Sequence, residues 1–162
     1  MTKVKNPLLI DSVRPEWIDY NGHMTDSAYA ILFSIAVDQF MVKVGIDEDF
    51  REKVKYSIFT LETHLCYLKE AHKGQSLQVS IQLLDYDSKR LHVFFTMENE
   101  KGDRLATSEQ MLMGMNMEDG HTAPFPEEIQ INIEELSKAQ TNMEVPKEAG
   151  RKIGIRKKSR NE

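Results

Sequence analysis

Hydrophobic and polar positions along the chain predict one long buried helix and several strands. From Ala28 to Val44 nearly every position is apolar, which predicts a helix of about 25 Å that is buried on most sides. Gly45 is a natural end for this helix. Before it, the apolar run 8–13 stops at Arg14-Pro15 and predicts a first strand.

The residues after the helix have the two-residue period of strands. Strands are expected over 58–68, 77–83, 90–97 and 105–117, separated by segments of turn composition. A short helix is expected from Pro126 to about Ala139. A strand, a buried helix and four further strands predict an α+β fold with one antiparallel sheet. In the strand over 58–68, strict alternation places Phe59, Leu61, Thr63, Leu65 and Tyr67 on the core face, and Ile58, Thr60, Glu62, His64 and Cys66 on the other.

Candidate chemistry is concentrated in the turn between the first strand and the long helix. Asp19, Gly22 and His23 lie there, just before the helix N-terminus. That end of a helix has unpaired N–H groups and partial positive charge, which suit a developing oxyanion. Asp19 could be only a turn residue, but its position before a buried helix favours a catalytic role.

The same turn carries a resemblance to a known family. The run Asp19-x-x-Gly22-His23-Met24-x-x-x-Ala28-Tyr29 resembles the active-site segment of hotdog-fold acyl-CoA thioesterases of the 4-hydroxybenzoyl-CoA type. The common form of that segment has two Asn where this chain has Thr25 and Asp26. Together with the segments 57–64 and 89–92, this variant is similar to a narrower group, the betainyl-CoA thioesterases of bacterial carnitine degradation.

The resemblance implies a fold and an activity. It implies an antiparallel sheet of about five strands wrapped around the long helix, and a homodimer or homotetramer with sites between subunits. It implies hydrolysis of a short acyl-CoA, most specifically betainyl-CoA, to the free acid and CoA. No metal or redox cofactor is expected, since CoA enters as part of the substrate. A thioesterase for another short aliphatic or aromatic acyl-CoA, or a non-catalytic acyl-CoA-binding module, remains open.

The resemblance also assigns roles to residues. Asp19 is expected to activate water or to attack the thioester directly, and N–H groups from Gly22 to Ala28 to bind the oxyanion. His23 is equally consistent with a packed residue, and the alternative for Glu62 is an ordinary exposed strand glutamate. Trp17, Tyr20 and Tyr67 are candidates for contacts with a trimethylammonium group, although packing is the alternative for each. A buried or interface role is expected for Asp38. The predicted site comprises catalytic Asp19, Gly22, His23 and Glu62; substrate-binding Trp17, Asn21, Thr60, His64 and Tyr67; and CoA-binding Lys69, Lys89 and Arg90.

Composition and charge narrow the picture further. The 162 residues suit a single domain, taken as 1–145, followed by a basic tail over 146–162. The net charge of −5 gives the chain no overall positive electrostatic field that would attract nucleic acid. No membrane span or signal peptide is expected. The single cysteine, Cys66, excludes an intrachain disulfide and favours the cytoplasm. His64-x-Cys66 places two ligand types on one strand face, but no second pair with the spacing of a zinc site follows. The tail is expected to be solvated, or to reach the phosphates of CoA.

Overall fold

The computed structural model describes residues 6–158. Its secondary structure follows the predicted order, with two additional short helices, one on each side of the long helix. The elements are β1 (Leu9–Ser12), the 3₁₀ helix η1 (Pro15–Trp17), α1 (Asp26–Val44), α2 (Glu48–Val54), β2 (Tyr56–Tyr67), β3 (Ser76–Tyr86), β4 (Arg90–Asn99), β5 (Arg104–Asn116) and α3 (Glu127–Ala139).

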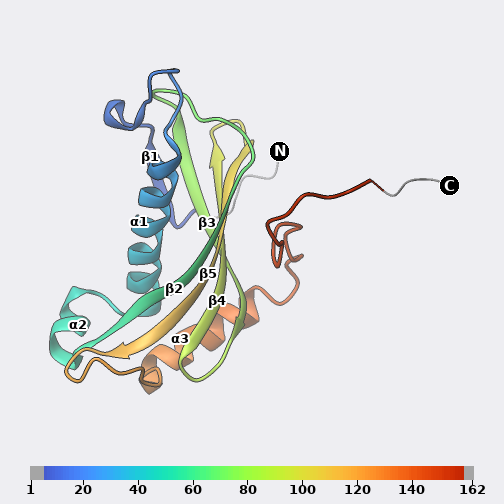
Figure 1. Ribbon diagram of the computed structural model, residues 1–162. Coiled ribbons are helices and arrows are strands. Elements are labelled where there is room, and N and C mark those ends of the chain that lie inside the picture. Colours follow the sequence, from blue (N-terminus) through green and yellow to red (C-terminus); the bar gives the residue numbers. More distant parts are fainter. Residues whose placement is uncertain (1–5, 159–162) are drawn as a thin grey trace.

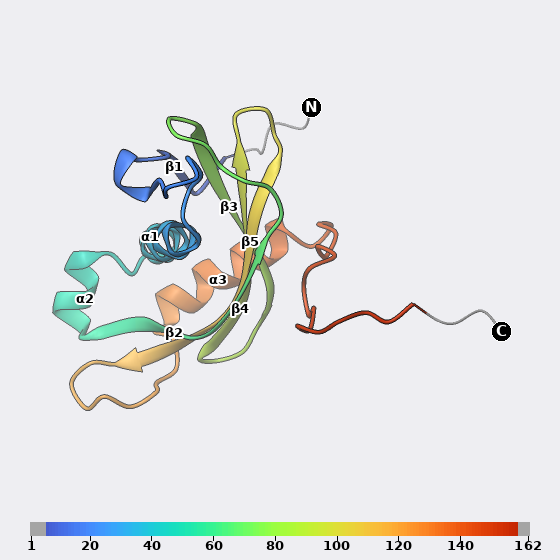
Figure 2. The same cartoon turned by 45° about the horizontal axis from the view of Figure 1, so that its top comes forward.

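The strands form one antiparallel sheet that curves around α1. Their spatial order is β1-β3-β4-β5-β2, and every neighbouring pair is antiparallel. Figure 1 shows α1 running along the concave side of the sheet, and Figure 2 shows the same helix almost end-on, enclosed by the curve. This confirms the predicted wrapped sheet of five strands.

α1 is buried along one side rather than all round. Nine of its residues are buried, from Ala28 to Val44, with the three- and four-residue spacing of a single helix face. Ile31 and Val42 on the opposite side are 47% and 52% exposed, and Asp38 is exposed too. The prediction of burial on most sides is therefore wrong for the single chain, and of the two roles expected for Asp38 only the interface role stays a prediction. By length and composition alone α1 could cross a membrane, but here it forms the centre of the domain.

A β-bulge in β2 changes which residues share a face. Thr60 is paired with Leu112 of β5, whereas Glu62 is paired with Met111, so Leu61 is an additional residue in the ladder. The predicted strict alternation is wrong at this point. Thr60 shares the helix-facing side with Thr63, while Glu62 and His64 lie on the outer side of the sheet.

β2 is an edge strand with exposed apolar side chains. No other strand of the described residues pairs with that edge. Phe59 and Leu61, both expected in the core, are 43% and 51% exposed there. An unpaired edge with apolar side chains is a surface suited to another chain.

The C-terminal part of the chain packs against the sheet. α3 begins after Pro126, as expected, and Asn132 Nδ2 donates to the Val44 carbonyl at the end of α1 (2.8 Å). Gln140 then bonds the β3 backbone at Ile81 and Leu83. The packed segment continues to Gly150, so the boundary predicted at residue 145 falls inside it.

Candidate active site

The turn that carries Asp19 is closed by its own backbone. Asp19 N–H donates to the His23 carbonyl (2.9 Å), and Gly22 N–H donates to the Asp19 carbonyl (3.1 Å). Gly22 has a φ of 79°, a left-handed conformation that glycine adopts without strain. The sequence Asp-x-x-Gly-His therefore folds into a tight loop because glycine permits its last turn.

The Asp19 side chain is fixed by the same loop. Its Oδ1 accepts the N–H groups of Asn21 (2.8 Å) and His23 (3.3 Å). Its Oδ2 makes no hydrogen bond within residues 6–158. One oxygen thus orients the carboxylate, and the other is left for chemistry.

Three further contacts tie the loop to the core. Met24 N–H donates to the Ala71 carbonyl (2.9 Å), and Thr25 N–H donates to the Trp17 carbonyl (2.8 Å). Ala71 N–H in turn donates to Tyr29 Oη (3.1 Å), inside the protein. The β2–β3 connection and the first turn of α1 therefore jointly hold the catalytic loop.

Trp17 joins the catalytic loop to the core. Its side chain is 6% exposed, belongs to the core, and lies under Arg14, whose guanidinium carbon is 4.6 Å from the ring centroid. It does not line the cavity around Asp19. Packing, the alternative to the predicted substrate contact, is what this position favours.

The loop forms one wall of a cavity of about 320 Å³. His23 Nε2 lies 3.2 Å from Glu70 Oε2, and the Tyr67 hydroxyl donates to the Asp26 carbonyl (3.2 Å). Tyr29 and Tyr67 meet edge to face, with ring centroids 5.2 Å apart. The cavity is lined by Asp19, Asn21, His23, Met24, Asp26, Tyr29, Tyr67, Leu68, Lys69 and Glu70.

Charge in this cavity is predominantly negative. Asp19, Asp26 and Glu70 contribute carboxylates, whereas the one lysine, Lys69, is already paired with Asp103 (2.7 Å). Burial raises the pKa of Tyr29, and burial with Asp26 nearby raises that of Tyr67. Both phenols are therefore neutral near pH 7. The cavity can accept a positively charged group beside a basic carboxylate.

The N–H groups expected to bind an oxyanion are mostly occupied. From Gly22 to Ala28, six of the seven donate within the chain. The exception is Asp26 N–H, at the first residue of α1, which has no acceptor within the described residues. The predicted helix N-terminus thus supplies one free N–H group rather than a row of them.

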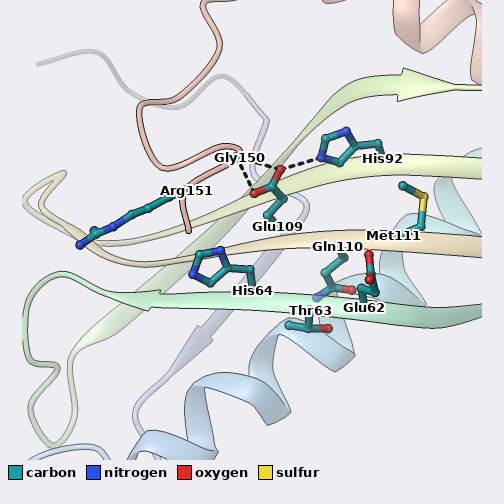
Figure 3. A pocket seen from close by; sticks show the side chains of 9 residues that line it. All are labelled: Glu62, Thr63, His64, His92, Glu109, Gln110, Met111, Gly150 and Arg151. Atoms are coloured by element: carbon teal, nitrogen blue, oxygen red, sulfur yellow. Dashed lines mark hydrogen bonds and ion pairs between the residues drawn. The ribbon is translucent and has the colours of Figure 1, made fainter. Parts of the chain in front are cut away.

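Glu62 and His64 line a different cavity. It has a volume of about 520 Å³ and lies on the outer side of the sheet, as Figure 3 shows. There His92 Nε2 lies 2.7 Å from Glu109 Oε2, and Glu109 also accepts Gly150 N–H (2.8 Å). Thr60 lines neither cavity. Within one subunit Glu62 and Asp19 therefore line different cavities, and the catalytic role of Glu62 stays a prediction for a site built between subunits.

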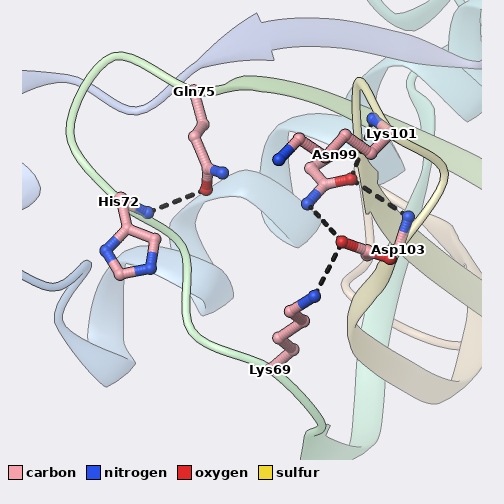
Figure 4. Close-up of polar contacts among 6 residues, drawn as sticks. All are labelled: Lys69, His72, Gln75, Asn99, Lys101 and Asp103. Atoms are coloured by element: carbon pink, nitrogen blue, oxygen red, sulfur yellow. Dashed lines mark hydrogen bonds and ion pairs between the residues drawn. The ribbon is translucent and has the colours of Figure 1, made fainter.

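The predicted CoA-binding cations are also separated. Lys69 lies beside the Asp19 cavity, where Asp103 is held by Asn99 as well (3.2 Å; Figure 4). Lys89 and Arg90 lie at the start of β4, and ten residues of that strand span about 30 Å. Arg90 Nε donates to Asp87 (2.6 Å), which lowers the pKa of that carboxyl to about 2. Lys69 and Arg90 therefore lie near opposite ends of β4 within one subunit.

Several contacts in the site were not predicted from the sequence. Tyr29 lies in the recognised motif, yet its role of accepting Ala71 N–H depends on a partner 42 residues away. The pairing of His92 with Glu109 is likewise a cross-strand contact. Within residues 6–158, no three His, Cys, Asp or Glu side chains are grouped in a way that could hold a metal ion.

Known proteins resemble this chain over most of its length. Residues 13–133 match the model of the Thioesterase-like superfamily. The chain belongs to this family. The betainyl-CoA thioesterase of Pseudomonas aeruginosa is 39% identical over 156 residues, covering 96% of this chain and 95% of that protein. The L-carnitine dehydrogenase/betainyl-CoA thioesterase of Rhizobium meliloti is 36% identical over 90% of this chain, which spans 30% of that longer protein.

Solved structures agree with this family assignment. The Staphylococcus aureus protein SAV2348, solved in complex with CoA, has a TM-score of 0.88 and 36% identity, covering 96% of this chain and 99% of that one. The DHNA-CoA thioesterase of the same organism has a TM-score of 0.74 at 16% identity, covering 85% of this chain and 95% of that one, and so shares the fold. The predicted resemblance is confirmed: this superfamily member is a hotdog-fold thioester hydrolase.

Proposed function

We propose that the protein hydrolyses betainyl-CoA to glycine betaine and CoA. The observation that carries this proposal is the Asp19 carboxylate, oriented by its own loop at the wall of a negatively charged cavity. A betainyl group places a permanent positive charge within a few bonds of the thioester carbonyl. The identity to betainyl-CoA thioesterases supports the choice of this acyl group.

Asp19 can act in either of two ways. As a base, its free oxygen takes a proton from water while the water oxygen attacks the thioester carbon. As a nucleophile, it attacks that carbon itself and forms a mixed anhydride, which water then hydrolyses. In both routes the carbon–sulfur bond breaks, the CoA thiolate leaves and takes up a proton, and the carboxylate of betaine remains. Neither route needs a metal or a redox cofactor.

We assign oxyanion stabilisation to Asp26 N–H. It lies at the first residue of α1, where the helix dipole favours negative charge, and it has no acceptor within the described residues. Its residue lines the same cavity as Asp19. A donor here would stabilise the tetrahedral intermediate more strongly than the neutral thioester.

We propose that a second subunit completes the site. The unpaired edge of β2 and the exposed Phe59 and Leu61 support an interface there. Such an interface would place β2 of one subunit, with Glu62, beside the other subunit. Glu62 would then act across the interface of a homodimer, or of a homotetramer built from two dimers. A single-domain enzyme with one cysteine and a CoA ester as substrate is assigned to the cytoplasm.

A neutral isostere of the substrate tests the acyl group. 3,3-Dimethylbutyryl-CoA has the shape of betainyl-CoA with carbon in place of the charged nitrogen. We expect kcat/KM for betainyl-CoA to be higher by about 10- to 100-fold, since a desolvated cation beside carboxylates and aromatic rings is stabilised by ~1.4–2.7 kcal/mol. Acetyl- and benzoyl-CoA should be poorer still.

Two other outcomes would contradict the proposal. Equal turnover of the two isosteres would show that the site does not recognise the charge, and would assign another short acyl-CoA as substrate. Binding without turnover of any ester in the panel would contradict the proposed hydrolysis itself. Thiol release followed with a thiol reagent measures each case.

A further inference from the structure

We propose that the basic arm, defined as residues 147–158, binds the phosphate groups of the CoA moiety. This inference rests on the proposed function, because it concerns the far end of the same substrate. It gives a role to a segment that composition alone would leave as a solvated tail. Lys147, Arg151 and Arg156 are its central residues.

The start of the arm is anchored to the sheet. Arg104 of β5 donates two hydrogen bonds to Glu148 (3.0 and 2.8 Å), whose side chain is 3% exposed. This pairing lowers the pKa of Glu148, which is therefore charged near neutral pH. Gly150 N–H then donates to Glu109 (2.8 Å). The arm thus leaves the sheet from a fixed point.

Beyond this anchor, the arm carries unbalanced positive charge. Glu148, its one carboxylate within the described range, is already neutralised by Arg104. No carboxylate of residues 6–158 forms an ion pair with the arm's own cations, in contrast to Lys69 and Arg90. The arm has six basic residues: Lys147, Arg151, Lys152, Arg156, Lys157 and Lys158.

A cavity lies among these cations. It has a volume of about 350 Å³ and is lined by Lys147, Glu148, Arg151 and Arg156. Guanidinium groups bind phosphate through two parallel hydrogen bonds, and two of them face this space. A site with two Arg, one Lys and a neutralised Glu is suited to a dianionic phosphate or a pyrophosphate.

The same arginine connects this cavity to the β2 edge. Arg151 also lines the 520 Å³ cavity on the outer side of the sheet, which extends to Glu62 of β2 (Figure 3). This is the edge where the proposed function places the neighbouring subunit. A CoA molecule held by its phosphates at the arm could lead its pantetheine chain along this surface toward the interface.

Beyond its anchor, the arm is not used for packing within its own subunit. Ile153 and Ile155 are each 93% exposed, and Figures 1 and 2 both show the last described part of the chain, coloured red, extending away from the sheet. Its cations therefore do not serve to hold this segment to the domain. A ligand with several phosphates accounts for a cationic segment that is anchored at one end and open beyond it.

The test compares two substrates and two full-length variants. In the variant R151Q/R156Q we expect KM for betainyl-CoA to rise about tenfold with kcat unchanged. Betainyl-pantetheine, which lacks the phosphates and the adenosine, should have the same KM in variant and wild type. The matched control R51Q/K53Q removes two cations from α2, across the molecule from the arm, and should leave both substrates unaffected.

An unchanged KM for betainyl-CoA would overturn the proposal, and so would an equal rise for betainyl-pantetheine. Calorimetry with free CoA and with 3′-dephospho-CoA separates this question from the choice of acyl group. If the wild type binds CoA without hydrolysing betainyl-CoA, weaker CoA binding by R151Q/R156Q would still support the arm. Unchanged CoA binding would refute it.

Discussion

Tyr29→Phe removes one hydroxyl from the support of the catalytic loop and nothing else. The Tyr29 side chain is 4% exposed, and its Oη accepts the N–H of Ala71, a residue that is 0% exposed. Phenylalanine has the same shape, so no cavity large enough to matter is created. The change leaves a buried backbone N–H without an acceptor.

The burial of this hydrogen bond determines how much stability Tyr29→Phe should lose. A buried donor that loses its partner costs about 1–3 kcal/mol, so the free energy of unfolding should fall by ~2 kcal/mol. Ala71 also receives the Met24 N–H bond that positions the loop before α1. A less firmly held Ala71 loosens the Asp19 loop, and kcat should fall by roughly tenfold.

Urea unfolding followed by fluorescence measures the free energy of unfolding, and thiol release from the acyl-CoA measures kcat. Tyr67→Phe is the matched control in the same cavity. Its hydroxyl donates to the Asp26 carbonyl (3.2 Å), but the residue is 54% exposed, so water can replace the lost bond. That variant should change stability by less than about 0.5 kcal/mol.

A Tyr29→Phe protein as stable as the wild type would refute this reasoning. So would a larger loss in Tyr67→Phe than in Tyr29→Phe. An unchanged m-value is required for the comparison, since it shows that both variants unfold from the same compact state.

Three further predictions concern the scaffold. Glu148→Gln should lower the free energy of unfolding by ~1–2 kcal/mol at pH 7. Because the pKa of Glu148 in the folded protein lies below its usual value of 4.5, this loss of stability should shrink as the pH falls below 4.5. A loss of stability that stays constant with pH would contradict this. Gly114→Ala should lower the free energy of unfolding by at least ~3 kcal/mol, because its Cβ would lie 1.8 Å from Tyr56 Oη and 2.7 Å from the Ala123 carbonyl oxygen. The Cβ of the control Gly154→Ala would meet nothing within 4 Å, so thermal unfolding of that variant should match the wild type. Asp87 should titrate near pH 2 by NMR and move toward 3.8 in Arg90→Gln, and an unchanged midpoint in that variant would rule out Arg90 as the cause.

The order of the elements follows from local pattern, and this part of the fold was predictable. The apolar run 28–44 and the period-two segments after it correspond to α1 and to β2–β5. The turn at Asp19 was predictable as well, since Gly22 and a following helix restrict what the backbone can do there.

The errors came from contacts that local pattern does not encode. The bulge at Leu61 depends on the register with β5, so one extra residue moved Thr60 away from the face of Glu62 and His64. The exposure of Phe59, Leu61, Ile31 and Val42 depends on what the rest of the chain covers, which hydrophobic periodicity cannot show. The sequence predicts these residues to be buried because an apolar side chain has the same place in a hydrophobic pattern whether it is buried or exposed.

The anchored start of the C-terminal segment was hidden for a similar reason. Glu148 is one acidic residue in a basic run, and its partner Arg104 lies 44 positions earlier. Composition predicts a solvated tail from such a run, while the ion pair is visible only in three dimensions.

The central claim is that Asp19 carries the hydrolysis. The most direct measurement is kcat for betainyl-CoA in Asp19→Asn beside Asp26→Asn, which removes a neighbouring carboxylate from the same cavity. We expect Asp19→Asn to lower kcat by at least about 10³-fold with little change in thermal stability, and Asp26→Asn to stay within about tenfold of wild type. A folded Asp19→Asn enzyme with near-wild-type kcat would contradict it.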